Sequence, residues 1–181
     1  MILHMDSDAF FVRPLAVERC FTDGHPVYFR VDGAALSDEH EAWTHTARAV
    51  LGVDDTAPAN RQYIKNCIPW SCDIVRKMTA RIESTQGFHW YDVLRYLHSL
   101  SEYFIYGQFV DSGGYEDQLA GSDQSFCLSF WPGREDEPFS LDGQSQRLKP
   151  HHVAMAVQST EKLDLDARNE IFKGMILSDD R

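Results

Sequence analysis

The first eleven residues, Met1-Ile2-Leu3-His4-Met5-Asp6-Ser7-Asp8-Ala9-Phe10-Phe11, decide the fold prediction. An apolar run leads into two carboxylates spaced one residue apart and then into two aromatic residues. This pattern predicts a buried strand that delivers Asp6 and Asp8 to the end of a sheet. Because residues i and i+2 of a strand share one face, both carboxylates are expected to point the same way.

Two carboxylates held this close repel each other unless a positive charge lies between them. A divalent cation with oxygen ligands supplies that charge. Open α/β sheets bind ligands beyond the carboxyl ends of their strands, which is where the pattern places this pair. Asp6 and Asp8 are therefore candidate metal ligands. The structural alternative is a pair of acids on a solvated loop, since such triplets also arise by chance in acidic proteins.

Length and composition limit the class of protein. The 181 residues suit a single domain that spans 1–181 and buries a core. The net charge of -11 argues against a nucleic-acid-binding surface, which needs clustered Lys and Arg. The four cysteines lack the paired spacing of zinc sites. No signal peptide and no apolar stretch of about 20 residues is present, so the sequence predicts a cytoplasmic protein without a membrane span.

The remaining chain alternates strand and helix patterns. A helix is expected after Ser37 through Leu51, with Gly52 at its end, and a second between Ser71 and Gly87. The remaining expected segments are a strand over 27–31, a helix over 89–100, a loop over 111–123, strands over 126–131 and 153–159, and a helix over 164–175. This order predicts an α/β fold with a mixed sheet flanked by helices.

Three ionisable residues outside the first strand are further candidates. Glu102 stands among aromatic residues at the end of an apolar helix, where desolvation would raise its pKa and suit it to proton transfer. The alternative for Glu102 is an exposed acid at a helix end. His151 and His152 precede the last core strand and are placed to reach a site. The alternative for both histidines is an ordinary surface position.

Residues 2–11 resemble the opening strand of the Y-family DNA polymerases, in which the Asp holds two magnesium ions for nucleotidyl transfer. Those enzymes have a second acidic motif well downstream, whereas Ser37-Asp38-Glu39 comes far too early in this chain. They also have basic DNA-binding domains, for which this acidic chain has neither the length nor the charge. A polymerase-like nucleotidyl transferase is therefore a minor alternative.

A second resemblance covers most of the chain. Asp6-Ser7-Asp8 after an apolar strand resembles the Asp-x-Asp motif of glycosyltransferases of the GT-A fold, which use nucleotide-sugar donors. Ser101-Glu102-Tyr103-Phe104-Ile105-Tyr106-Gly107, which follows Gly87-Phe88-His89-Trp90, is similar to a segment of bacterial glycosyltransferase-like proteins, some of them linked to surface polysaccharide. Because the nucleotide-binding strands of that fold precede its Asp-x-Asp motif, the resemblance implies the C-terminal part of the fold.

This resemblance implies roles for individual residues. Asp8, with help from Asp6, would hold Mn²⁺ or Mg²⁺ against the diphosphate of the donor. His152 or His151 matches the position of a histidine that completes the metal shell. Glu102 matches the carboxylate that deprotonates the acceptor hydroxyl in inverting members. Trp90, Tyr103 and Tyr106 would stack on a sugar face, and the alternative for these aromatic residues is a position in the core.

The predicted function is metal-dependent transfer of a sugar from a nucleotide-diphosphate donor to a carbohydrate acceptor, in surface polysaccharide synthesis. The alternative from another class is a non-catalytic remnant that serves as a binding or assembly module. The missing strands leave three alternatives open, namely a truncated gene product, an inactive relative, and a protein whose missing strands come from a partner chain. Exposed sheet edges also favour association into a homo-oligomer. Metal-dependent affinity for a nucleotide sugar separates the two functions.

Overall fold

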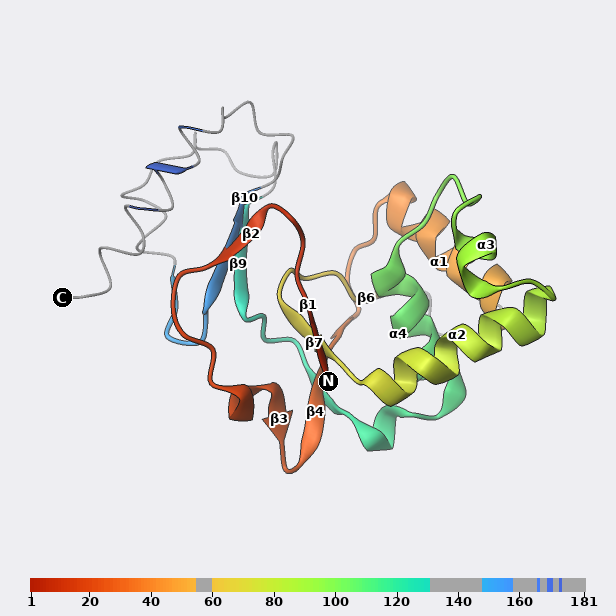
Figure 1. Ribbon diagram of the computed structural model, residues 1–181, viewed down its shortest axis with the longest axis horizontal. Helices are drawn as coiled ribbons and strands as arrows, with labels where there is room; N and C mark the ends of the chain where they lie inside the picture. Colours follow the sequence, from red (N-terminus) through yellow and green to blue (C-terminus); the bar gives the residue numbers. More distant parts are fainter. Residues whose placement is uncertain (55–59, 131–147, 158–165, 167–168, 171–172, 174–181) are drawn as a thin grey trace. The chain divides into compact units, whose positions relative to one another are not determined.

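The structure is a computed structural model that describes residues 1–54, 60–130, 148–157, 166, 169–170 and 173 (Figure 1). The chain divides into two compact units. We call Met1–Ile2, Cys20–Ile64 and Pro69–Asp123 the helical unit, and Leu3–Arg19, Lys65–Ile68 and Gln124–Arg181 the strand unit. The helix predicted over 164–175 lies largely outside the described residues.

The helical unit contains both helices and strands, and the strand unit pairs strands in both the parallel and the antiparallel direction. The predicted α/β class is therefore confirmed. The strands form several small sheets. Two strands, β1 (Ile2–His4) and β7 (Ile68–Trp70), each contain a boundary between the units. None of the described helices combines the length and the hydropathy needed to cross a membrane.

Four helices dominate the helical unit, where α1 packs beside α2 and α4 (Figure 1). They are α1 (Asp38–Leu51), α2 (Cys72–Gln86), α3 (Trp90–Leu94) and α4 (Glu102–Gly113). The strands of this unit are β3 (Phe21–Thr22), β4 (His25–Phe29), β5 (Val31–Asp32), β6 (Arg61–Gln62) and β8 (Ala120–Ser122).

The ends of α1 and α2 follow from local sequence. The Ser37 side chain accepts a hydrogen bond from the His40 N–H, and His40 Nδ1 accepts one from the Ser37 N–H, which completes a capping box. Gly52 and Gly87 end the two helices in the left-handed region, with φ of 61° and 74°. Both helices therefore begin and end where the sequence predicts.

The predicted helix over 89–100 is shorter than expected. It ends at Leu94, where the Leu97 N–H bonds the Leu94 carbonyl in a turn, and Glu102 begins the separate helix α4. No residue of α3 is buried. Because most helical stability comes from a packed apolar face, the half-buried Val93 and Leu94 give the chain little reason to continue the helix.

The predicted loop over 111–123 is wrong in its first and last parts. Helix α4 continues to Gly113, and β8 then pairs in parallel with β4, with Ala120 opposite Val27 and Ser122 opposite Phe29. This strand has little apolar patterning of its own. Its conformation is decided by the pairing with β4, a contact that spans about ninety residues of sequence.

A buried carboxylate, Asp111 on α4, organises the helical unit. Its side chain is 3% exposed, and its Oδ2 lies 2.7 Å from Arg61 Nη1. The Tyr63 hydroxyl donates to Asp111 Oδ2 at 2.5 Å, and the Tyr28 hydroxyl donates to Oδ1 at 3.2 Å. Burial, followed by the charge of Asp111, raises the pKa of both tyrosines, so their hydroxyls stay protonated and donate.

The network continues from Tyr63 deeper into the unit. The Tyr63 hydroxyl accepts a hydrogen bond from Gln108 Nε2 at 3.1 Å, and Gln108 Oε1 accepts one from Arg48 Nε at 3.0 Å. Both Gln108 and Arg48 are buried. These bonds satisfy polar groups that burial would otherwise destabilise, and they connect α1 with α4.

The strand unit is built on a three-stranded sheet in which β10 (Ala154–Val157) lies between β2 (Ala9–Phe11) and β9 (Cys127–Phe130) (Figure 1). Strand β10 runs antiparallel to β2 and parallel to β9. Every residue of β10 is buried, as expected for a central strand. Its core includes Val12, Phe130, Met155 and Val157.

Candidate metal centre

The Asp6-Ser7-Asp8 triplet lies in a turn between β1 and β2. The Ala9 N–H donates to the Asp6 carbonyl at 3.1 Å, which closes the turn. The predicted continuous strand through this triplet is therefore wrong. A turn ends the alternation of side chains along a strand, so the spacing of Asp6 and Asp8 does not by itself place their carboxylates on one face.

A histidine that the sequence analysis did not select lies beside Asp6. His4 and Asp6 offer ligand atoms within 4.8 Å of each other, and both side chains are half-buried. A divalent ion with ligand distances of about 2.0–2.6 Å fits between atoms at this separation. The sequence already places this histidine close to the carboxylate, because His4 precedes Asp6 by only two residues.

The turn is fixed to the central strand of its unit. The Asp8 carbonyl accepts a hydrogen bond from the Val157 N–H at 3.2 Å, at the end of β10. The Asp8 side chain is half-buried. A carboxylate on a turn that is bonded at both ends loses less freedom on binding an ion than one on an unattached loop.

The chemistry around the turn favours oxygen and nitrogen ligands over sulfur. Burial raises the pKa of the Cys127 thiol to about 12, and the charge of nearby Asp6 contributes to the increase. Without a metal Cys127 therefore stays a thiol, and a metal would have to displace its proton in order to bind the sulfur. Carboxylate oxygen with imidazole nitrogen suits Mn²⁺ better than Mg²⁺, which usually takes oxygen ligands.

A buried amide of the same unit, Asn66, has an acceptor oxygen with no described donor. Asn66 is fully buried, and its Nδ2 donates to Ser129 Oγ at 3.4 Å, next to Cys127. Its Oδ1 accepts no hydrogen bond from any residue that the structure describes. A buried acceptor without a donor is costly, and a cation or a water molecule relieves the cost.

The strand register separates His152 from Asp8. In the β2–β10 pair Ala156 lies opposite Ala9 and Ala154 lies opposite Phe11, so Asp8 is at the Val157 end of β10. His152 precedes the other end, five residues away, which corresponds to roughly 16 Å along a strand. Ligand atoms of one ion lie within about 5 Å of each other. The structure therefore does not bring His152 together with Asp8.

His152 instead takes part in a basic cluster that holds the start of β10. Its Nδ1 accepts a hydrogen bond from the Lys149 N–H at 3.1 Å, and its carbonyl accepts one from Arg13 Nη1 at 3.2 Å. The ring of His151 packs edge-on against the ring of His152 at 4.3 Å, and the His151 carbonyl accepts a hydrogen bond from Arg19 Nη2. A neutral His152 with Nδ1 as acceptor carries its proton on Nε2.

We expect His152 to make the strand unit sensitive to acid. Burial, together with the neighbouring positive charges, lowers the pKa of His152 to about 4 from an ordinary value of 6.5. As the pH falls below 6.5, the unfolded chain takes up a proton before the folded one does, so stability is full above 6.5 and declines towards pH 4. His152→Asn, whose Oδ1 can replace Nδ1, should show a smaller loss between pH 7 and pH 4.5 in thermal unfolding. An equal loss in both proteins would contradict this role.

Among the candidate residues of the helical unit, Glu102 is exposed whereas Tyr103 and Tyr106 are buried. Glu102 is the first residue of α4 and is exposed, so it lacks the desolvation that the sequence analysis expected. Tyr103 and Tyr106 are buried, and the Tyr106 ring stacks on Trp70 with centroids 4.7 Å apart. Burial raises the pKa of Tyr106 to about 12. The rings of Tyr103 and Tyr106 therefore pack in the hydrophobic core.

Trp90 is half-buried and packs edge-on against Tyr91 at 6.0 Å. The aromatic side chains with the most exposed area in this region are others, namely Phe88, Tyr91 and Tyr96, which are 71%, 56% and 69% exposed. Tyr91 and Tyr96 fall within the helix predicted through Leu100, and the sequence of this helix does not show which of its aromatic residues face solvent.

Comparison with known proteins gives a family and no established activity. The chain has no significant match among curated proteins or among solved structures. Residues 1–135 match a family described as a family of unknown function, and this range includes Asp6, Asp8 and Glu102 but ends before His151. The match covers 135 of the 181 residues, about three quarters of the sequence. The chain belongs to this family, DUF6492.

Proposed function

We propose that this chain is a metal-dependent glycosyltransferase that moves a sugar from a nucleoside-diphosphate donor to a carbohydrate acceptor, in surface polysaccharide synthesis. The observation that carries the proposal is the pair of ligand atoms from His4 and Asp6, within 4.8 Å of each other, at the turn that resembles an Asp-x-Asp motif. The family description assigns no activity.

In this proposal His4 and Asp6 would hold Mn²⁺, and Asp8, whose carbonyl is fixed by its bond to Val157, would be a further ligand. The metal, when bound, neutralises the charge that develops on the departing diphosphate. His151 and His152 receive no ligand role, because Nδ1 of His152 is already an acceptor and the register places it far from Asp8.

Glu102 keeps the role that the resemblance implies, as the base that takes the proton of the acceptor hydroxyl. Its exposure at the start of α4 leaves it accessible to an acceptor molecule. A base at this position does not need to bind the metal or the donor. The base role and the ligand roles can therefore be tested separately.

The second candidate is a non-catalytic binding or assembly module. It is favoured by the burial of Tyr103 and Tyr106, which removes two of the three aromatic residues expected to stack on a sugar. It is also favoured by the exposed rings of Phe88, Tyr91 and Tyr96, since exposed aromatic residues are enriched where proteins contact partners. This function needs no metal.

Calorimetric titration with uridine and guanosine diphosphates, with and without Mn²⁺, distinguishes the two functions. We expect saturable binding that Mn²⁺ tightens at least about tenfold, and we expect Asp6→Ala and His4→Ala each to abolish this gain, because each removes a charge-assisted or coordinate bond. Glu18→Ala, which removes an exposed carboxylate of the same unit, serves as the control and should bind normally. Glu102→Gln should also bind normally.

Two outcomes would contradict the proposal. The first is the absence of nucleotide binding to a chain shown to be folded by its helical circular dichroism. The second is nucleotide binding that is as tight without Mn²⁺, or in Asp6→Ala, as it is in the unaltered chain with Mn²⁺. Either result would leave the assembly module as the better account of this chain.

A further inference from the structure

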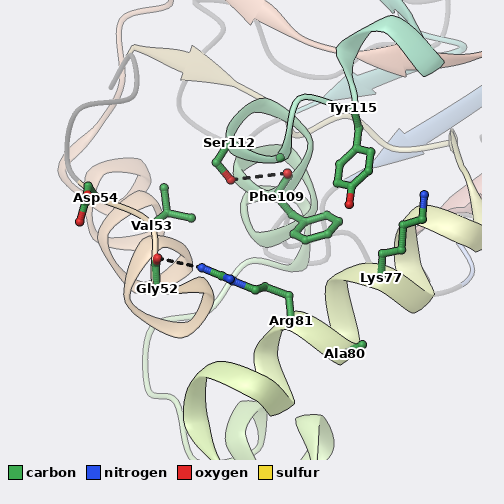
Figure 2. A pocket seen from close by; sticks show the side chains of 10 residues that line it. Gly52, Val53, Asp54, Lys77, Ala80, Arg81, Phe109, Ser112 and Tyr115 are labelled. Atoms are coloured by element: carbon green, nitrogen blue, oxygen red, sulfur yellow. Dashed lines mark hydrogen bonds between the residues drawn. The ribbon is translucent and has the colours of Figure 1, made fainter.

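A cleft of about 780 Å³ opens on the helical unit, and its described lining includes none of the residues assigned so far (Figure 2). It is lined by the end of α1, by one face of α2 and by the end of α4. This volume lies within the range of roughly 300–1,000 Å³ that is typical of small-molecule sites. All of its lining residues belong to one unit, so the cleft is a property of that unit alone.

Two cationic side chains one helical turn apart line the cleft. Lys77 and Arg81 are four residues apart on α2, so they lie on the same face of the helix. Lys77 Nζ lies 4.8 Å from the centre of the Tyr115 ring, in a cation–π contact. Arg81 donates from Nε to the Leu51 carbonyl at 2.8 Å and from Nη2 to the Gly52 carbonyl at 3.2 Å. Both charges are therefore held in place before a ligand arrives.

Among the residues that the structure describes, no carboxylate forms an ion pair with Lys77 or Arg81. Four other arginines of this unit do pair with carboxylates, namely Arg30, Arg61, Arg76 and Arg95. Figure 2 shows Asp54 at the end of the cleft opposite Lys77. Two unpaired cations in one cleft stand out in a protein whose net charge is -11.

The helix ends around the cleft do not cancel this charge. The C-termini of α1 and α4 contribute carbonyls, each equivalent to about half a negative charge. The two helix ends amount to about one negative charge, and Asp54 adds a second at the end of the cleft opposite Lys77. The end of the cleft beside Lys77 therefore remains positive, and Arg81 already satisfies carbonyls at the end of α1 through Nε and Nη2. Its Nη1 group makes no hydrogen bond with any described residue and keeps two N–H donors.

Tyr115 forms a rigid wall that adds a hydroxyl to the site. Its ring stacks on Phe109 with centroids 5.2 Å apart, and it lies so close to Gly113 that a Cβ there would come within 2.5 Å of it. With Phe109 on one side and Lys77 on the other, the ring has little surface left for stacking on a ligand. The polar groups, rather than the ring faces, are therefore the features that select a ligand.

We propose that this cleft binds a phosphorylated small molecule through its phosphate or pyrophosphate group, with Lys77, Arg81 and the Tyr115 hydroxyl as the contacts. Arginine presents a planar set of N–H donors that matches phosphate oxygens, and a lysine one turn away contacts a second oxygen of the same group. Val53 and Ala80 line the remainder with small apolar surface for the organic part of the ligand.

The test is calorimetric titration of the full chain with inorganic pyrophosphate in the presence of a metal chelator. Lys77→Gln should weaken binding about tenfold, the cost of one charge-assisted hydrogen bond. Arg76→Gln removes the same charge from the adjacent residue of α2, which faces solvent and pairs with Asp73, and should change affinity less than about twofold. Tyr115→Phe should weaken binding without any change of charge.

Three results would overturn the proposal. They are no saturable binding below about 10 mM, an equal loss in Arg76→Gln and Lys77→Gln, and binding of citrate as tight as that of pyrophosphate. The equal loss would indicate general attraction to a basic helix face. Asp6→Ala should leave this binding unchanged, so the failure of this site and the failure of the metal centre are separate results.

Discussion

Asp111→Asn is expected to lower the free energy of unfolding of the helical unit by about 3 kcal/mol, the low end of the range for breaking a buried ion pair. The substitution conserves volume and removes the charge that Arg61 and Arg30 face and that the Tyr63 hydroxyl donates to. Asp32 and Glu116 still lie beside both arginines, which is why the loss stays at the low end. The donors that remain would be buried and less well satisfied.

Urea unfolding followed by circular dichroism measures this effect, because α1 to α4 all belong to the helical unit. The matched control is Asp32→Asn, which removes a carboxylate that contacts the same Arg30 and Arg61 but is 59% exposed. An exposed pair contributes about 0–1 kcal/mol, so the control should change little. If the two variants were equally stable, burial would not be what makes the Asp111 pair strong.

The parts of the fold that sequence predicts well are those decided by neighbours in the chain. Ser37 with His40 and the left-handed Gly52 specify α1 within a few residues of its ends, and Gly87 does the same for α2. Capping bonds join residues three to five positions apart, so the sequence contains all of the information needed to place them.

Contacts between distant residues account for what sequence did not predict. The bonds of Asp111 reach Tyr63 and Tyr28 across 48 and 83 positions, and nothing near Asp111 in the sequence indicates these partners. The same holds for β8, which has little apolar patterning and becomes a strand through its pairing with β4. Tertiary contacts override local preference in both cases.

The residues of the candidate metal centre also divide into those that local sequence features predict and those that depend on long-range contacts. Asp6 and Asp8 could be selected because their spacing and the preceding apolar run are local features. The position of His152 could not, since it depends on the register of β10 against β2. His4 lies two residues from Asp6, but an imidazole is not part of the paired-carboxylate pattern that marks Asp6 and Asp8.

Gly107→Ala is expected to destabilise the helical unit by about 2 kcal/mol or more, although alanine is the better helix former. A Cβ on Gly107 would lie 2.3 Å from Cδ1 of Tyr63, closer than any real contact. Alanine gains about 1 kcal/mol of helix propensity over glycine in α4. Overpacking a rigid core costs about 1–3 kcal/mol and sometimes more, and the upper part of this range applies if the tyrosine ring cannot move.

The surroundings of Tyr63 indicate that its ring cannot move. The ring meets Phe104 edge-on at 5.3 Å and stacks on Tyr28 at 6.3 Å, while its hydroxyl bonds Asp111 and Gln108. A shift that relieves the clash would break at least one of these contacts. The steric cost therefore exceeds the propensity gain, and the strain falls on the helix that begins with Glu102.

Urea unfolding of Gly107→Ala beside Gly121→Ala measures this balance. A Cβ on Gly121 would meet nothing within 4 Å, so the control should change stability by no more than about 0.5 kcal/mol. If Tyr63 is the obstacle, Gly107→Ala combined with Tyr63→Ala should cost less than the sum of the two single changes, because the cavity left by one accepts the methyl group of the other. Strict additivity would show that α4 adjusts to the added methyl group without pressing on Tyr63.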